Sequence, residues 1–167
     1  MTEPLLKVQN LSVDFSTPGG AVQAVKQVSF EVGKGETLAL VGESGSGKSV
    51  SALSILQLLP YPVARHPNGS IRFEDQEMIG APDATLRGIR GNDIAMIFQE
   101  PMTSLNPLHT IEKQINEVLF VHKGLARRAA RERTLELLNL VGLSDAEKRL
   151  NAYPHELSGG QRQRVMI

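Results

Sequence analysis

One eight-residue segment, residues 42–49, restricts the possible folds of this chain more than any other feature. It reads Gly-Glu-Ser-Gly-Ser-Gly-Lys-Ser and matches G-x-x-x-x-G-K-[ST] at every fixed position. Residues 36–41 before it form a predicted strand, and residues 48–59 after it carry apolar side chains at helical spacing until Pro60. The segment is therefore expected to connect a strand to a helix within an α/β fold.

The composition of this segment, which we call the P-loop, is typical of a phosphate-binding turn. Glycines let the backbone approach phosphate oxygens, successive N–H groups line the concavity, and the helix N-terminus adds a favourable dipole. Lys48 is expected to reach the β and γ phosphates of a nucleotide, and Ser49 to hold Mg²⁺. The alternative is a flexible Gly/Ser-rich turn that matches by accident, which is expected on the order of one per cent of the time for ordinary glycine usage. The candidate nucleotide contacts are Gly42, Glu43, Ser44, Gly45, Ser46, Gly47, Lys48, Ser49 and Val50.

Composition excludes several other classes of protein. The 167 residues amount to about one domain. Lys plus Arg and Asp plus Glu are equal at 18 each, so the chain lacks the bulk positive charge of a general nucleic-acid binder, and no nucleic-acid partner is expected. The absence of cysteine excludes disulfides, thiolate metal sites and cysteine nucleophiles. No apolar run reaches the roughly 18 residues of a membrane span, and the N-terminus lacks an export signal, so a cytoplasmic location is expected.

The pattern of apolar residues changes along the chain. In residues 6–15, apolar and polar side chains alternate as in a strand, with one slip at Asn10. This segment is expected to form a hairpin-like sheet with a second strand at residues 22–32. Residues 60–69 are rich in proline and are expected to form a loop. Expected strands cover residues 6–15, 22–32, 36–41, 70–74 and 93–98. Expected helices cover residues 48–59, 83–89, 111–122 and 127–141. The change from mixed to helical character places a boundary near residues 100–107, giving subdomains 1–100 and 101–167.

A second motif stands near the end of the sequence, where Leu157, Ser158, Gly159, Gly160 and Gln161 precede a basic, helix-compatible run. Alone, such a turn would often be only a helix N-cap. Together with the P-loop upstream, it resembles the ATP-binding subunits of ABC transporters, whose LSGGQ signature lies between the P-loop and the Walker B strand. The resemblance implies an ABC-type P-loop NTPase of the α/β class, with an N-terminal antiparallel β subdomain, a helical subdomain, and ATP and Mg²⁺ as ligands.

The resemblance also implies roles for individual residues. Gln99 corresponds to the family's Q-loop glutamine, which contacts Mg²⁺ and the attacking water, so that Lys48 and Gln99 are the catalytic candidates. Phe15 takes the position of an aromatic residue that stacks on adenine. Taken singly, Gln99 could be a polar residue at a strand end and Phe15 a core residue. The signature segment, residues 157–161, is expected to contact ATP held by a second ATPase domain in a head-to-tail dimer.

Finer features are similar to the oligopeptide and dipeptide importer group. They are the P-loop with Val50, residues 97–107, and Tyr153-Pro154-His155, and they are most similar to tandem-domain members of that group. The chain would then be the N-terminal ATPase domain, peripheral at the cytoplasmic face of the inner membrane. Residues 99–122 would receive a helix of the transmembrane permease subunits. His155 is expected to be a hydrogen-bonded loop residue without a catalytic role.

The family pattern continues beyond Ile167 with a strand ending in Asp-Glu and a switch histidine. We therefore expect this sequence to be a truncated, incomplete ATPase that is inactive alone. The alternatives are a non-transport ABC ATPase of the DNA-repair or chromosome type, and a nucleotide-binding module without activity. The lack of a coiled-coil or zinc-bearing insertion between the motifs favours transport. Five cationic residues are expected to form a solvated helix face; they are Lys123, Arg127, Arg128, Arg131 and Arg133.

Overall fold

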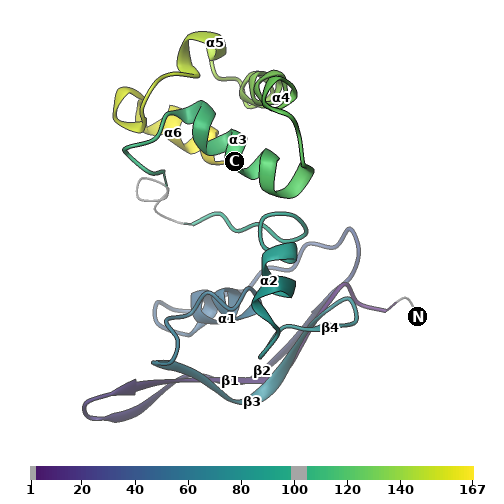
Figure 1. Ribbon diagram of the computed structural model, residues 1–167. Helices are drawn as coiled ribbons and strands as arrows, with labels where there is room; N and C mark the ends of the chain where they lie inside the picture. The colour runs from purple at the N-terminus through teal and green to yellow at the C-terminus, as the bar shows by residue number, and fades with distance from the viewer. Residues whose placement is uncertain (1–2, 99–104) are drawn as a thin grey trace. The chain divides into compact units, whose positions relative to one another are not determined.

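The computed structural model describes residues 3–98 and 105–167 (Figure 1). The chain forms two compact units, residues 1–90 and residues 91–167. The boundary expected between residues 100 and 101 lies outside the described residues, so it stays a prediction. No helix in the described ranges has the length and apolarity that a membrane span needs.

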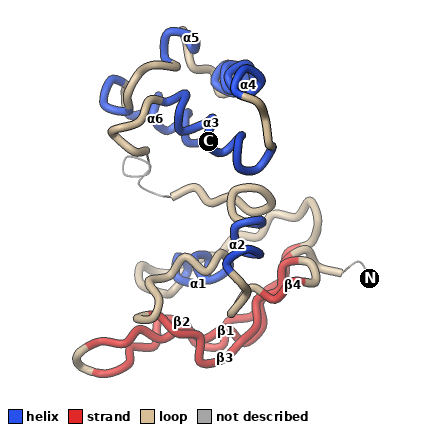
Figure 2. The backbone as a smooth tube through the Cα atoms, viewed as in Figure 1, coloured by secondary structure: helices blue, strands red, loops and turns tan. Residues whose placement is uncertain are grey.

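A four-stranded antiparallel sheet is the framework of the first unit (Figure 2). Its strands are β1 (Leu6–Thr17), β2 (Gly20–Val32), β3 (Ala64–Phe73) and β4 (Gln76–Glu77), in the order β2-β1-β3-β4. The predicted hairpin of the first two strands is confirmed, with Phe15 opposite Val22. The core of this unit includes Val8, Leu11, Val13, Val25, Ile71 and Met78.

The slip in alternation at Asn10 corresponds to an irregularity in β1. Asn10 has a φ of +49°, and the register with β2 shifts between Val8 and Leu11. The Asn10 N–H donates to the hydroxyl of Ser29 at 2.8 Å instead of joining the regular ladder. Gly69 of β3 lies against this point, because a Cβ there would stand 2.6 Å from the Cα of Leu11. The bulge therefore lets two backbones approach closely, and a glycine is needed at the contact.

The edge strand β4 is held to β3 by the side chain of Glu77. Its Oε1 accepts hydrogen bonds from the N–H groups of Ile71 and Ile79, both at 3.0 Å, and its Oε2 accepts one from the Ser70 hydroxyl. Burial alone would raise the pKa of this carboxyl, but the hydrogen bonds from Ser70 and the neighbouring backbone outweigh it, and the pKa is lowered. Glu77 is therefore a charged group that ties β4 to β3.

Two helices, α1 (Lys48–Ile55) and α2 (Asp83–Ile89), lie on one side of the sheet (Figure 1). The predicted helix at residues 83–89 is confirmed. The first helix ends at Ile55 rather than at residue 59, because the backbone turns into the left-handed region at Gln57, where φ is +51°. Arg90 closes this end by donating to the carbonyls of Leu56 and Gln57 at 2.8 and 2.7 Å.

Three predicted strands differ from the structure. Residues 36–41 form no strand, because no neighbouring segment among the described residues pairs with them. Residues 93–98 contribute only an isolated bridge at Ile94, whose carbonyl accepts from the Gly91 N–H at 2.9 Å. Leu38 and Leu40 are each 41% exposed as a result. The strand expected at residues 70–74 begins earlier, at Ala64, because β3 pairs with β1 along its length.

The second unit is helical, with α3 (Ile111–Lys123), α4 (Arg127–Leu140), α5 (Ala146–Arg149), a 3₁₀ helix η2 (Pro154–Glu156) and α6 (Gly159–Met166). The helices predicted at residues 111–122 and 127–141 are confirmed to within one residue at one end. Thr110 caps α3 by accepting from the Lys113 N–H at 3.4 Å, and Gly124 ends it with a φ of +58°. The core of this unit is made by Ile111, Leu138, Leu143, Ala146, Leu150, Ala152 and Leu157.

Candidate nucleotide site

The P-loop holds its shape through a close contact with the sheet. Gly47 is the N-cap of α1 and has a φ of +87°, in the left-handed region that favours glycine. A Cβ at this position would lie 2.6 Å from the carbonyl oxygen of Ala24 and 3.1 Å from a methyl group of Val25. Since Ala24 and Val25 belong to β2, the turn packs directly on the strand, and a side chain at Gly47 would push it away.

Lys48 lies across the P-loop. Its Nζ donates to the carbonyls of Gly42 and Glu43 at 2.8 and 2.6 Å and approaches the Ser46 hydroxyl at 3.1 Å. A Cβ added to Gly42 would stand 2.8 Å from that hydroxyl and 3.9 Å from Nζ, so a side chain there would displace the Ser46 hydroxyl. The ammonium group is therefore held by neutral oxygens that an anionic phosphate can replace.

Several backbone donors of the P-loop remain open to a ligand. The first helical hydrogen bond of α1 runs from the Ser51 N–H to the Gly47 carbonyl at 2.8 Å, so the N–H groups of residues 48–50 precede the helical ladder. Gly47 carries no side chain to cap them, and α1 has no acidic residue in its first turn. These donors, together with Lys48, fit the requirements of a phosphate group.

Ser49 and Val50 follow Lys48 in the first turn of α1, and the Ser49 side chain is exposed. Among residues 3–98 and 105–167, no three His, Cys, Asp or Glu side chains group as metal ligands. A hydroxyl beside a phosphate site suits Mg²⁺, which usually binds to few protein oxygens together with phosphates and water. The donor set at the P-loop therefore fits a magnesium–nucleotide.

Phe15 is half-buried in β1, where it pairs with Val22 of β2 and with Ala64 of β3. Val22 stands two positions before Ala24 on β2, which is the residue that Gly47 approaches. At about 3.3 Å per residue, this separation is about 7 Å along the strand. The sheet thus places the predicted adenine-stacking residue in the same region as the P-loop, although its role stays a prediction. Gln99 lies outside the described residues, and its role also stays a prediction.

The signature segment begins α6 and is preorganised by its own side chains. The Ser158 hydroxyl accepts from the Gln161 N–H at 3.3 Å, and the Gln161 side chain accepts from the Ser158 N–H at 2.9 Å. This capping box orients the first turn. Leu157 is buried in the core of the second unit, whereas Gly159 and Gly160 are exposed, with nothing within 4 Å of an added Cβ. The segment therefore presents bare backbone at a helix N-terminus.

The far end of α6 is attached to α4. No residue of α6 is fully buried, although Val165 packs partly against the core. Arg164 donates from Nη1 to the carbonyl of Gly142 at 2.6 Å, just beyond the end of α4. The P-loop and the signature segment belong to different units of the chain.

His155 lies in η2 and is exposed, as expected of a loop histidine. Its ring stacks on Tyr153, with centroids 5.7 Å apart and planes 16° apart. The described residues include no hydrogen-bond partner for it, which differs from the sequence prediction. Sequence reasoning also missed Ala24, whose contribution is a backbone carbonyl that no side-chain motif can indicate.

The site and fold can be compared with known proteins. The ABC transporter family model matches residues 25–167, and this chain belongs to that family. A solved structure described as a dimeric post-hydrolysis state of the ATP-binding cassette MJ0796 bound to ADP and Pi is 29% identical, with a TM-score of 0.81. The alignment covers 96% of this chain and 66% of that one. The expected ABC-type fold is confirmed.

Comparison with individual relatives indicates which group of ABC transporters this chain resembles. The peptidoglycan transport ATP-binding protein YejF of Agrobacterium fabrum is 63% identical, over 99% of this chain and 30% of the relative. The oligopeptide transport ATP-binding protein OppD of Bacillus subtilis is 51% identical, over 98% of this chain and 46% of the relative. The expected similarity to the peptide importer group is confirmed, and the chain spans between about a third and a half of these proteins' lengths.

Proposed function

We propose that this chain is the nucleotide-binding part of an ABC-type ATPase that couples ATP binding and hydrolysis to peptide import. The observation that carries the proposal is the P-loop geometry, in which Gly47 packs on β2 and Lys48 lies across a turn with open backbone donors. The name of OppD, an oligopeptide transport ATP-binding protein that is similar over 98% of this chain, supports the substrate class.

In this proposal the chain's own groups bind and orient the triphosphate. Lys48 exchanges its bonds to the carbonyls of Gly42 and Glu43 for bonds to the β and γ phosphates, and the N–H groups at the start of α1 donate to phosphate oxygens. Ser49 supplies its hydroxyl to Mg²⁺, which neutralises charge on the phosphates when it is bound. Phe15 stacks on adenine, and Gln99 orients the attacking water near the metal.

The exposed signature helix suits contact with a second ATPase domain. The exposed backbone of Gly159 and Gly160 can approach a γ-phosphate held by the P-loop of that domain without steric hindrance. Two such contacts related by symmetry would produce a head-to-tail dimer with ATP at each interface. The partners are then a second ATPase domain and transmembrane permease subunits, with the protein peripheral at the cytoplasmic face of the inner membrane.

The proposal is tested by replacing Lys48 in the full-length protein. Lys48→Ala removes the principal side-chain cation of the P-loop, and loss of one transition-state stabiliser costs about 10²- to 10³-fold in rate. We expect Mg-ATP affinity to fall at least about tenfold and hydrolysis to fall by that larger factor. The matched control is Lys34→Ala, which removes an exposed lysine outside the P-loop. Titration and phosphate release measure the two effects.

Unchanged ATP affinity together with unchanged hydrolysis in Lys48→Ala would contradict the P-loop assignment. The coupling of ATP hydrolysis to peptide transport has a separate test, in vesicles that contain the full-length protein and its permease subunits. Uptake of a labelled peptide is expected to require ATP and to stop with Lys48→Ala. Hydrolysis that proceeds without any peptide uptake would reject the transport half of the proposal and leave the ATPase half standing.

A further inference from the structure

A groove of about 790 Å³ lies between α3 and α4, and none of its lining residues belongs to the P-loop or to the signature segment. Its volume is within the range of roughly 300–1,000 Å³ that is typical of small-molecule sites. Four cationic side chains line it, and Glu112 is the acidic residue among them. The cations are Lys113, Arg127, Arg128 and Arg131. We call this feature the cationic groove.

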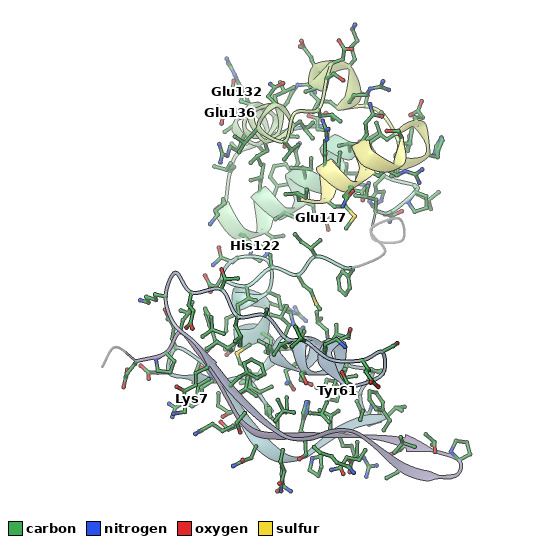
Figure 3. The ribbon with its side chains drawn as sticks, turned by 180° about the vertical axis from the view of Figure 1, so that it is seen from behind. Lys7, Tyr61, Glu117, His122, Glu132 and Glu136 are labelled. Carbon is green, nitrogen blue, oxygen red and sulfur yellow. The ribbon has the colours of Figure 1, made fainter. Side chains whose placement is uncertain are left out.

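The positive charge of the cationic groove is local, because the whole chain has a formal net charge of zero. The acidic residues of α4 do not line it. Glu132 and Glu136 are one helical turn apart on α4 (Figure 3), and they pair with Arg128 at 3.1 Å and Arg133 at 2.8 Å. Arg127 makes no ion pair within the described ranges. The helix thus leaves an unneutralised cation at the groove.

Arg131 is held in place before any ligand arrives. Its Nη1 donates to both carboxylate oxygens of Glu112 at 2.9 Å, and the Glu112 side chain is only 18% exposed. Its other guanidinium nitrogens have no partner among the residues that the structure describes. A guanidinium fixed in this way loses less conformational freedom when it binds an anion than a mobile side chain does.

A buried amide also lines the cationic groove. Asn116 is 6% exposed, and its Oδ1 accepts a hydrogen bond from the fully buried Thr134 hydroxyl at 2.7 Å. This bond orients the amide, and its Nδ2 has no acceptor in the described part of the chain. The amide thus presents an oriented donor to an acceptor in the groove.

The position of the arginines is not explained by the stability of α4 itself. Arg127 and Arg128 are in the first turn, which contains no acidic residue and has no side-chain cap. Cations at this end of a helix are opposed by the helix dipole. An anion in the groove would reverse that unfavourable interaction.

We propose that the cationic groove binds a phosphate-bearing anion. The phosphoryl oxygens accept hydrogen bonds from Arg127, from the free edge of Arg131 and from Nδ2 of Asn116. A phosphate suits this arrangement because it presents several acceptors to donors on two helices, and arginine binds it in a bidentate manner. The ligand is either a free phosphorylated compound or the headgroup of a phospholipid.

The test uses the full-length protein with Lys48→Ala as background, so that phosphate binding at the P-loop does not contribute. The test variant adds Arg127→Glu, which breaks no ion pair among the described residues. The matched control adds Arg133→Glu, which makes the same charge change on the same helix outside the groove. Thermal melts establish whether all variants fold. If Arg127→Glu does not fold, Arg127→Gln takes its place.

Two probes distinguish the sources of phosphate. Calorimetry measures binding of inorganic pyrophosphate, and flotation measures binding to phosphatidylglycerol vesicles against phosphatidylcholine vesicles. We expect one probe or both to bind, with affinity at least about tenfold weaker in Arg127→Glu and within twofold of the background in Arg133→Glu. Binding of pyrophosphate indicates a free compound, and binding only to phosphatidylglycerol vesicles indicates a lipid headgroup. Absence of binding to either probe overturns the proposal, as does an equal loss in both variants, since that would reflect net charge alone.

Discussion

Two helices of this molecule begin at a Gly-rich turn, yet they reach their geometry in different ways. The start of α1 depends on the sheet, because the Ala24 carbonyl of β2 leaves room at position 47 only for a residue without a side chain. The start of α6 depends on its own side chains, because Ser158 and Gln161 cap each other. One turn is therefore shaped by a distant strand and leaves its donors open, whereas the other is shaped locally.

The difference extends to what holds each helix. Ser51 and Ser54 of α1 are buried, and their hydroxyls donate to the carbonyls of Gly47 and Val50 at 3.0 and 2.8 Å. The signature helix α6 has no fully buried residue. A phosphate site built on the first helix is thus supported by its own unit, whereas the exposed start of the second suits a surface that meets a partner.

The largest expected effect tests whether the signature segment acts on a partner's nucleotide. Gly159→Leu adds a bulky side chain where an added Cβ would meet nothing within 4 Å, so the second unit should fold normally. Hydrolysis by the full-length protein is expected to fall about 10²- to 10³-fold, while the ATP affinity of the monomer stays within twofold. Steady-state hydrolysis and equilibrium titration check the two parts. An equal loss of monomer affinity would place the signature segment in the same site as the P-loop.

The second expected effect tests the dependence of α1 on the sheet. Gly47→Ala places a Cβ in a left-handed conformation, at a cost of about 1–2 kcal/mol, and against the Ala24 carbonyl, at a cost of about 1–3 kcal/mol more. We expect the free energy of unfolding of the first unit to fall by about 3 kcal/mol, measured by hydrogen exchange in β2 and α1. Gly159→Ala is the matched control, with a change within about 0.5 kcal/mol. Equal effects at both glycines would remove the contrast between the two turns.

A smaller effect concerns the sheet behind the P-loop and its response to acid. Glu77 has a lowered pKa in the folded state, so it binds protons less readily there than in the unfolded chain. Its contribution is present above the unfolded pKa of about 4.3 and is lost as the pH falls through the folded pKa. Glu77→Ala is expected to cost about 1–3 kcal/mol at neutral pH, because the N–H groups of Ile71 and Ile79 lose their acceptor. Denaturation at pH 7 and pH 3 measures the difference, which should shrink at pH 3; an equal cost at both values would contradict this role.

The smallest expected effect concerns the capping of α6. Ser158→Ala removes the hydroxyl that accepts from the Gln161 N–H, and loss of such a cap costs about 1 kcal/mol. Hydrogen exchange of residues 161–163 should speed up about fivefold, while exchange in α3 and α4 stays the same. Slower exchange, or a change that spreads through α4, would show that α6 is held by packing rather than by its cap.

Local signals explain the parts of the fold that the sequence predicted correctly. The helices at residues 83–89, 111–122 and 127–141 correspond to α2, α3 and α4, because caps and stops act through near neighbours such as Thr110 and Gly124. The P-loop residues could be singled out for the same reason, since one short motif contains them, and their contacts with a nucleotide stay a prediction. The slip at Asn10 also became a real bulge.

The errors arise where structure depends on distant partners. Residues 36–41 have a suitable strand sequence, but a strand needs a neighbour, and the pattern of one segment does not supply it. Conversely, Pro67 and Asn68-Gly69 favoured a loop but lie within β3, where the register with β1 shifts between Ser12 and Asp14 and tolerates a proline. The contact between Gly47 and the Ala24 carbonyl was equally unpredictable, because every residue type offers the same carbonyl.

The bond from Arg164 to the Gly142 carbonyl fixes the C-terminal end of the signature helix. Leu157 anchors the chain in the hydrophobic core just before α6, and Arg164 attaches the opposite end of the helix next to the end of α4. The two ends of α6 are therefore held at different places, one in the hydrophobic core and the other beside the end of α4. The exposed backbone of Gly159 thus belongs to a helix that is joined, through Arg164 and the packing of Val165, to the helix that contributes the arginines of the cationic groove.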